Sequence, residues 1–215
     1  MAFSNQIDYW NSVSQDREFT TYLDHELVAK YLNPDSLIVD YGCGYGRTLN
    51  EFYALGYRNL IGFDYAAEMI KRGNVNYPHL DLRTCINDKI SCPSNSVDMV
   101  ILFAVLTCIK ENCKQEELIA EIWRVLKPGG LIYINDFLVN TDERNMNRYD
   151  EFAAKYGTYG IFELNDGAVL RHHERTYISE LTDGFNEKLF RKVTFKTMNG
   201  NTSNGFIFIG QKKEN

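Results

Sequence analysis

Three glycines at alternate positions, Gly42, Gly44 and Gly46, directly follow a short apolar run at residues 37–41. Glycine weakens the interior of a strand or helix, so this repetition indicates that a ligand approaches the backbone closely. A glycine-rich turn from a strand into a helix is typical of a nucleotide or nucleoside cradle, because bare backbone and free helix N–H groups face the ligand. The spacing G-x-G-x-G departs from the dinucleotide fingerprint G-x-G-x-x-G, which disfavours NAD.

Two carboxylates flank this turn in the sequence. Asp40 lies two residues before Gly42, and Asp64 lies 18 residues beyond Gly46 at the end of a second apolar run. A carboxylate in the position of Asp64 can accept hydrogen bonds from both hydroxyls of a ribose. The charge of Asp40 would be unfavourable against a pyrophosphate and favourable against an ammonium or sulfonium group. The pair therefore predicts a cationic nucleoside as the ligand, in preference to NAD.

Short apolar runs of strand length alternate with amphipathic helical segments over the first two thirds of the chain. Such alternation predicts an α/β fold, with a parallel sheet covered on both faces by helices and right-handed connections. Strands are expected at 37–41, 59–64, 79–85, 96–106 and 131–137. Helices are expected at 19–32, 47–56, 66–73 and 114–126.

The pattern changes after residue 137, where the segment 140–173 is polar, aromatic and partly helical. The tripeptide "NDG" at 165–167 lies between two short apolar runs and predicts a hairpin. Long excursions at strand ends often build binding sites, so this segment is expected to help form one. A short helix at 176–185 and a closing antiparallel hairpin of 189–197 and 205–213 are expected next.

Composition and charge narrow the class of protein. The chain has 215 residues, 44% of them hydrophobic and 24% charged, which predicts one soluble globular domain. The net charge of −6 argues against nucleic acid as the main partner, because phosphate binding requires a basic face. The five cysteines show no C-x-x-C spacing, which predicts reduced thiols in the cytoplasm and no metal site. There is no signal-peptide pattern and no apolar stretch near the ~18 residues of a membrane span, so no membrane association is expected.

Four motifs in order, "VDYGCGYG", "GFD", "SVDMVI" and "RVLKPGGLIYI", resemble those of the class I S-adenosylmethionine (SAM)-dependent methyltransferases. The resemblance covers residues 37–137, nearly half of the chain. It implies a Rossmann-like, seven-stranded, mostly parallel sheet with an antiparallel last strand and helices on both faces. It also implies a single methyltransferase domain over 1–215. Within it, 1–33 would form a helical segment over the cofactor site, and 140–175 would form a lid or substrate insertion between the fifth and sixth strands.

The same resemblance implies SAM as the cofactor and S-adenosylhomocysteine as its product. Cys43, which lies between two of the glycines, is interpreted as a packing side chain rather than a nucleophile. The expected cofactor-binding residues are Asp40, Gly42, Cys43, Gly44 and Gly46 around the methionine part, Asp64 at the ribose, Tyr65 and Met69 near the adenosine, Asn87 or Asp88 at the adenine, and Phe103 and Ala104 near the transferred methyl group.

Methyl transfer from a sulfonium is an in-line displacement at carbon, which requires alignment and desolvation but no covalent intermediate. Effective molarity can contribute roughly 7–11 kcal/mol to such a step. A base is needed only where the acceptor atom is protonated, and His172 and His173 are the candidates because an imidazole titrates near neutrality. The alternative is that both are polar strand residues. Neighbours on a strand face opposite sides, so at most one of them would reach a pocket.

The acceptor is expected to meet aromatic and basic side chains of the insertion and of the N-terminal segment. The stretch "DYWNSV" near the N-terminus could fold over SAM or pack on the edge of the sheet. Arginines and tyrosines of the insertion could hold an anionic or aromatic acceptor, or could pack against one another as a lid. The expected acceptor-binding residues are Tyr9, Trp10, Arg148, Tyr149, Tyr159, Arg171 and His172.

These observations favour an enzyme that transfers a methyl group from SAM to a small-molecule acceptor, as a monomer or homodimer in the cytoplasm. The segment "LFAVLTC" lacks the Asn/Asp-Pro-Pro-Tyr/Phe motif that nucleic-acid and glutamine N-methyltransferases carry after the fourth strand. Three alternatives stay open: a methyltransferase acting on tRNA, rRNA or protein, a non-catalytic SAM-binding protein, and an NAD-linked oxidoreductase.

Overall fold

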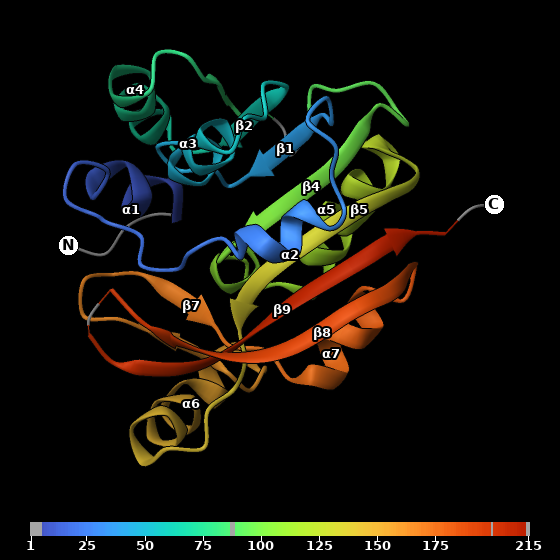
Figure 1. The fold of residues 1–215 in the computed structure, drawn as a ribbon. Helices are drawn as coiled ribbons and strands as arrows, with labels where there is room; N and C mark the ends of the chain where they lie inside the picture. Colours follow the sequence, from blue (N-terminus) through green and yellow to red (C-terminus); the bar gives the residue numbers. More distant parts are fainter. Residues whose placement is uncertain (1–5, 87–88, 199, 214–215) are drawn as a thin grey trace.

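The computed structural model describes residues 6–86, 89–198 and 200–213. Seven strands form its central sheet, in the order β3-β2-β1-β4-β5-β9-β8 (Figure 1). Their bounds are β1 (Ile38–Tyr41), β2 (Leu60–Asp64), β3 (Asp81–Thr84), β4 (Val97–Phe103), β5 (Leu126–Phe137), β8 (Phe185–Lys196) and β9 (Thr202–Lys212).

Neighbouring strands are parallel except at β9, which pairs antiparallel with both β5 and β8. Six strands therefore run one way and β9 runs against them, which confirms the mixed sheet expected from the sequence. The strand order reverses beside β1, because the chain first builds outward to β3 and then returns to place β4 on the other side of β1. Open α/β sheets bind their ligands at the carboxyl ends of the strands at such a reversal. The glycine turn after β1 lies at this edge.

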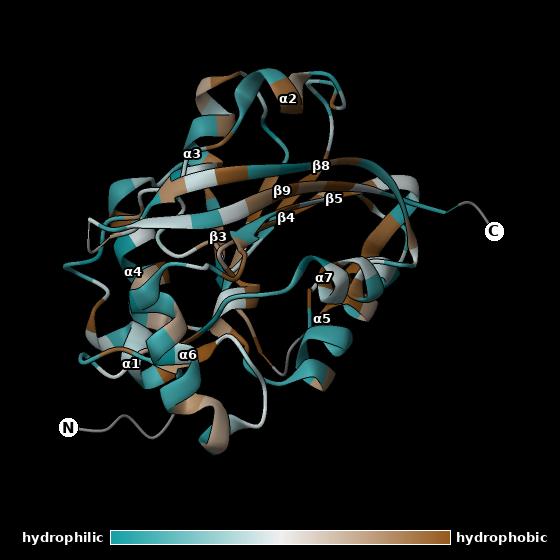
Figure 2. Cartoon of the chain, turned by 90° about the horizontal axis from the view of Figure 1, so that it is seen from below, coloured by the Kyte–Doolittle hydropathy of each residue, from teal (hydrophilic) through white to brown (hydrophobic). Residues whose placement is uncertain are grey.

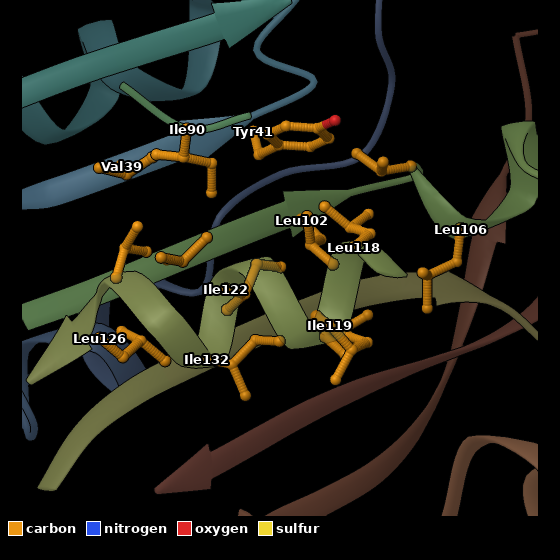
Figure 3. Close-up of a cluster of buried hydrophobic side chains, with 14 of the residues drawn as sticks. Val39, Tyr41, Ile90, Leu102, Leu106, Leu118, Ile119, Ile122, Leu126 and Ile132 are labelled. Atoms are coloured by element: carbon orange, nitrogen blue, oxygen red, sulfur yellow. The ribbon is translucent and has the colours of Figure 1, made fainter. Parts of the chain in front are cut away.

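Helices cover both faces of the sheet, with α2 and α3 on one side and α5 and α7 on the other (Figure 2). Consecutive residues of β1 divide between the two cores, since Ile38 packs in one hydrophobic cluster and Val39 in the other. Figure 3 shows the cluster that contains Val39, in which Ile122 of α5 points at the strands.

No helix in the described ranges combines the length and apolar character needed to cross a membrane. The helices around the sheet are α1 (Gln6–Ser12), α2 (His25–Ala29), α3 (Arg47–Ala54), α4 (Ala67–Asn76), α5 (Asn112–Val125) and α7 (Arg175–Leu181).

The chain between β5 and α7 forms the helix α6 (Glu143–Tyr156) and a separate hairpin of β6 (Ile161–Glu163) and β7 (Val169–Arg171). The hairpin confirms the turn predicted at 165–167. The end of this segment is fixed to the end of β5, because the backbone N–H of His173 donates to the carbonyl of Phe137 at 3.1 Å. Figure 1 places β7 and α1 at the end of the sheet to which β4 points.

Several element boundaries differ from the sequence expectation. The helix expected at 19–32 is reduced to α2, which Asp24 caps by accepting a hydrogen bond from the backbone N–H of Leu27 at 2.9 Å. The preceding residues have no regular structure, because the ring of Phe19 stacks instead on Tyr45 at 5.4 Å between ring centroids. The fifth strand begins at Leu126 rather than at 131, since Leu126 already pairs with β4.

The helix α4 continues through Gly73, where the sequence predicted its end, and reaches Asn76. A Cβ atom at Gly73 would lie 2.8 Å from the carbonyl oxygen of Tyr45 and 2.4 Å from a methyl group of Leu82. This glycine therefore permits close packing of α4 on the turn after β1 and on β3.

Replacing Gly73 by alanine should destabilise the protein by about 1–3 kcal/mol, because the added Cβ would overlap the backbone of Tyr45. In an unobstructed helix interior the same change would stabilise by about 1 kcal/mol. Gly184→Ala is the matched control, since its Cβ would meet only Trp123 at 3.6 Å. Urea unfolding measures the difference, and a Gly73→Ala variant as stable as the control would contradict this packing.

Candidate functional site

A cavity of about 810 Å³ lies at the carboxyl ends of the central strands. Asp40, Asp64 and Ala104 line it from the ends of β1, β2 and β4. The N-terminal segment contributes Trp10 and Phe19 to its wall, and the insertion contributes side chains of α6 and of the β6–β7 hairpin. Segments far apart in the sequence thus enclose one space next to the glycine turn.

The glycine turn has a backbone conformation that other residues rarely adopt. Gly42, Gly44 and Gly46 all have positive φ angles, of 77°, 55° and 84°. The N–H groups of Gly42 and Cys43 both donate to the carbonyl oxygen of Phe63, at 2.7 and 3.0 Å, which fixes the turn to β2. The repetition of glycine in the sequence is therefore a backbone requirement at each of the three positions.

Side chains also approach the turn too closely to allow a Cβ. One added at Gly44 would lie 2.6 Å from the ring of Phe19, and one added at Gly42 would lie 2.5 Å from a methyl group of Val105. Phe19 thus covers the turn on the cavity side. The sequence predicted a helix over 19–32, which gave Phe19 no role at this turn.

Asp64 joins the end of β2 to the glycine turn. One carboxylate oxygen accepts from the backbone N–H of Gly44 and the other from that of Ala66, both at 2.8 Å. Burial raises the pKa of Asp64 above its ordinary value, while the two hydrogen bonds favour the ionised form. The carboxylate is held at the cavity wall in a fixed orientation.

Asp40 is 1% exposed, and its Oδ1 atom has no hydrogen-bond partner among the described residues. Burial raises its pKa to about 7, against the lowering effect of the Arg47 guanidinium and together with the nearby charges of Asp64 and Glu51. A buried carboxylate without a partner is costly when ionised. The arrangement favours a cationic group placed in the cavity.

Backbone strain marks the end of β4. Ala104 has a φ of 52°, in the left-handed region that a residue with a Cβ rarely adopts. The conformation is held by its N–H, which donates to the carbonyl oxygen of Asn135 at 2.8 Å. Residues in such conformations cluster at functional sites, and both Phe103 and Ala104 line the cavity.

The structure brings together most of the residues expected to contact the cofactor. Gly46 does not line the cavity, because it faces Leu82 and Leu80 of the packed interior. Asn87 and Asp88 lie outside the described residues. Those that line the cavity are Asp40, Gly42, Cys43, Gly44, Asp64, Tyr65, Met69, Phe103 and Ala104.

The two N-terminal aromatic residues have different positions. Trp10 lines the cavity, whereas Tyr9 is buried behind it. The hydroxyl of Tyr9 donates to Asp166 at 3.1 Å and accepts from Arg17 at 2.8 Å, and Arg17 also pairs with Asp166. This network ties α1 to the β6–β7 turn.

Of the expected acceptor-binding residues of the insertion, Arg148 and His172 line the cavity. Tyr149 is fully buried behind them, and Tyr159 is exposed. Arg171 points elsewhere, since its guanidinium donates to the carbonyl of Lys110 and to the side chain of Asn112. The cavity wall therefore uses only part of the basic and aromatic set that the sequence suggested.

The adjacent histidines face opposite sides, as their neighbouring positions predict. His172 lines the cavity, while His173 lies at a separate site with one ring nitrogen 3.0 Å from the Gln115 amide and the other 3.4 Å from the Phe137 carbonyl. Burial lowers the pKa of His173 to about 3. Among the described residues, no group of three His, Cys, Asp or Glu side chains is arranged to hold a metal ion.

A family profile and two curated relatives that match this chain are all described as methyltransferases. A family profile described as a methyltransferase domain matches residues 39–134. A probable S-adenosylmethionine-dependent methyltransferase from Mycolicibacterium smegmatis is 34% identical over 109 residues, which are 50% of this chain and 38% of that protein. The mouse eEF1A lysine and N-terminal methyltransferase is 29% identical over 140 residues, which are 57% of this chain and 20% of that protein. The chain thus spans well under half the length of these two relatives.

A carboxy-S-adenosyl-L-methionine synthase from Campylobacter fetus is 27% identical over 179 residues, which cover 80% of this chain and 74% of that protein. Among solved structures, a SAM-dependent methyltransferase from Methanosarcina mazei superimposes with a TM-score of 0.86 at 24% identity, over 91% of this chain and all of that one. A Burkholderia thailandensis N1-methyltransferase with bound 1,6-didemethyltoxoflavin and S-adenosylhomocysteine gives a TM-score of 0.65 at 15% identity, over 88% of this chain and 76% of that one.

The strand order, the glycine turn and these matches define a Rossmann-like methyltransferase domain. Residues 39–134 match the methyltransferase domain family, and the fold is that of the class I S-adenosylmethionine-dependent methyltransferases, whose cofactor is SAM.

Replacing Asp64 by alanine should weaken SAM binding by roughly 1–3 kcal/mol, because charge-assisted hydrogen bonds are lost. The change also frees the N–H groups of Gly44 and Ala66, which the carboxylate now fixes. Asp81→Ala is the matched control, since Asp81 lies on the adjacent strand in an exposed pair with Arg83. Titration calorimetry measures both dissociation constants. An unchanged value for the Asp64 variant would remove this residue from the site.

Proposed function

We propose that the chain is an enzyme that transfers the methyl group of SAM to a small-molecule acceptor by in-line displacement. The observation that carries this proposal is the buried Oδ1 of Asp40, which has no hydrogen-bond partner among the described residues and lies beside the glycine turn. A carboxylate in that position favours a cation over a phosphate. SAM meets this requirement and, when bound, supplies an electrophilic methyl group on a sulfonium.

The residues that line the cavity suggest a division of binding roles. The backbone of the turn and Asp40 would hold the methionine part, and Asp64 would hold the ribose. Tyr65 and Met69 would flank the adenosine. The strained end of β4 at Ala104 would set the wall beside the reacting carbon.

The cavity also supplies the desolvation that this reaction needs. The aromatic rings of Trp10, Phe19, Phe103 and Phe137 line it and would displace water around the bound reactants. Fixed alignment of donor and acceptor can contribute roughly 7–11 kcal/mol. Displacement at carbon requires no covalent intermediate with the protein, so the residues need only bind and orient.

The enclosure of the site supports a small acceptor. The network of Tyr9, Arg17 and Asp166 joins the N-terminal segment to the insertion. Both segments line the cavity, which would restrict entry of a folded macromolecule. The net charge of −6 is unfavourable for RNA binding. The free thiols, of which Cys43, Cys85 and Cys92 are buried, support a reducing compartment such as the cytoplasm. Within this proposal the enzyme acts there as a monomer or homodimer.

With SAM carrying a labelled methyl group, we expect the label to enter the low-molecular-weight fraction of a cell extract. The extract is divided into metabolite, RNA and protein fractions, and each is incubated with the enzyme. Asp40→Asn serves as the control, because it keeps the size of the side chain and removes its charge. Label in the RNA or protein fraction, with none in metabolites, would overturn the small-molecule acceptor in favour of a macromolecular one.

Binding of SAM should release about one proton at about pH 6 and almost none at about pH 8. Asp40 is mostly protonated at the lower pH because burial raises its pKa to about 7, and a bound cation would lower that pKa and expel the proton. Calorimetry in two buffers of different ionisation enthalpy measures the release. Asp40→Asn should abolish it, and equal release by that variant would assign the proton to another group.

A further inference from the structure

The basic side chains at the insertion end of the cavity differ in their pairing. Each of three lysines that line the wall lies beside a glutamate. Arg148 lines the same wall, yet none of the described carboxylates lies within 4 Å of its guanidinium. The lysine pairs are Lys110 with Glu111, Lys114 with Glu117, and Lys155 with Glu163.

Arg148 is also partly removed from water. Its guanidinium carbon lies 3.5 Å from the centre of the Phe162 ring, and its Nε atom is sealed from solvent without a hydrogen-bond partner among the described residues. Burial is the main cause that lowers its pKa, which means that the charged form lacks solvation. Stacking on a ring compensates only in part for a missing counter-charge. An anion in the cavity would supply it.

His172 presents a hydrogen-bond donor to the same space. Its Nδ1 atom lies 2.6 Å from the hydroxyl of Tyr149 and 3.1 Å from the side-chain nitrogen of Asn140. The amide orientation of Asn140 is fixed because its oxygen accepts from the backbone N–H of Asn204 at 2.7 Å. The backbone N–H of Asn140 donates to the Tyr149 oxygen at 3.3 Å, which directs the Tyr149 proton to the imidazole.

Nδ1 of His172 therefore accepts from the Tyr149 hydroxyl, and a neutral ring then carries its proton on Nε2. Burial keeps the ring neutral by holding its pKa well below the ordinary value, and the charge of Arg148 acts in the same direction. In this tautomer the free nitrogen cannot take a proton from an acceptor. It can only donate a hydrogen bond.

The rings around these two groups form a continuous wall. Phe162 meets His172 edge to face at 4.9 Å, and Phe137 stacks on His172 at 5.3 Å with an angle of 18° between the planes. All three of these side chains line the cavity, as does Arg148. A flat ligand with a negatively charged edge would match aromatic walls that carry two donors.

We infer that the methyl acceptor is an aromatic carboxylate, whose carboxylate is bound by the guanidinium of Arg148 and by Nε2–H of His172. This inference rests on the proposed function, because it names the acceptor class of that site. Tyr149 and Asn140 are positioning residues that fix the tautomer of His172. His172 then recognises the acceptor and does not act as the general base that the sequence suggested.

The test uses benzoate and benzamide as probes, because they share a shape and differ in charge. Both are titrated into the full chain, with and without saturating S-adenosylhomocysteine. Wild type should bind benzoate about 10- to 100-fold more tightly than benzamide. Arg148→Met should lose this preference, and Arg148→Lys should keep part of it. Arg175→Met is the matched control, since Arg175 stacks on Phe190 at 3.8 Å and does not line this cavity.

Nitrogen NMR of the histidines gives an independent readout. Nε2 of His172 should show the shift of a protonated ring nitrogen and Nδ1 that of an unprotonated one, and Tyr149→Phe should mix the two tautomers. The inference fails if benzamide binds as well as benzoate, if the preference survives in Arg148→Met, or if Nδ1 carries the proton. Failure of S-adenosylhomocysteine to bind would instead contradict the proposed function. In that case the titration of benzoate in the absence of S-adenosylhomocysteine would still test the anion site.

Discussion

The carboxylate of Asp64 is the interaction on which the rest of the site depends. It accepts one hydrogen bond from the backbone N–H of Gly44, in the glycine turn after β1, and one from the backbone N–H of Ala66, two residues after the end of β2. Without it, the N–H of Gly44 would lose its acceptor, and the turn with its three alternate left-handed glycines would lose one of the contacts that hold its backbone. The parallel pairing of β1 with β2 supplies the register that makes this contact possible. The pairing of β1 with β2 thus holds the glycine turn and Asp64 in a fixed geometry before any ligand binds.

That surface is built at the expense of local stability. Asp40 is buried without a partner for one oxygen, and Ala104 has a strained backbone. Arg148 is partly buried, and its Nε has no hydrogen-bond partner among the described residues. Each of these features would destabilise an isolated protein, and each faces the same cavity. Opposite charges on two ligands would relieve the two electrostatic penalties separately: a cation at Asp40 and an anion at Arg148. In the proposed reaction, the site would hold a positively charged methyl donor and a negatively charged acceptor at separate places along one cavity.

The parts of the structure that the sequence could predict are those that local chemistry determines. The glycine spacing required left-handed backbone, the apolar runs had strand length, and "NDG" formed its hairpin. Tertiary contacts decided the rest. Phe19 lies outside the helix that the sequence predicted at 19–32, and its ring stacks on Tyr45 instead. The tautomer of His172 depends on Tyr149 and Asn140, which are 23 and 32 residues away in the sequence.

The central claim is that the glycine turn and its two acids bind a cationic adenosyl compound. The most direct test is calorimetric titration of the wild-type chain with SAM, S-adenosylhomocysteine and NAD under the same conditions. The account predicts that SAM and S-adenosylhomocysteine bind and that NAD does not, since Asp40 would face the pyrophosphate of NAD. Tight binding of NAD without binding of SAM would contradict it.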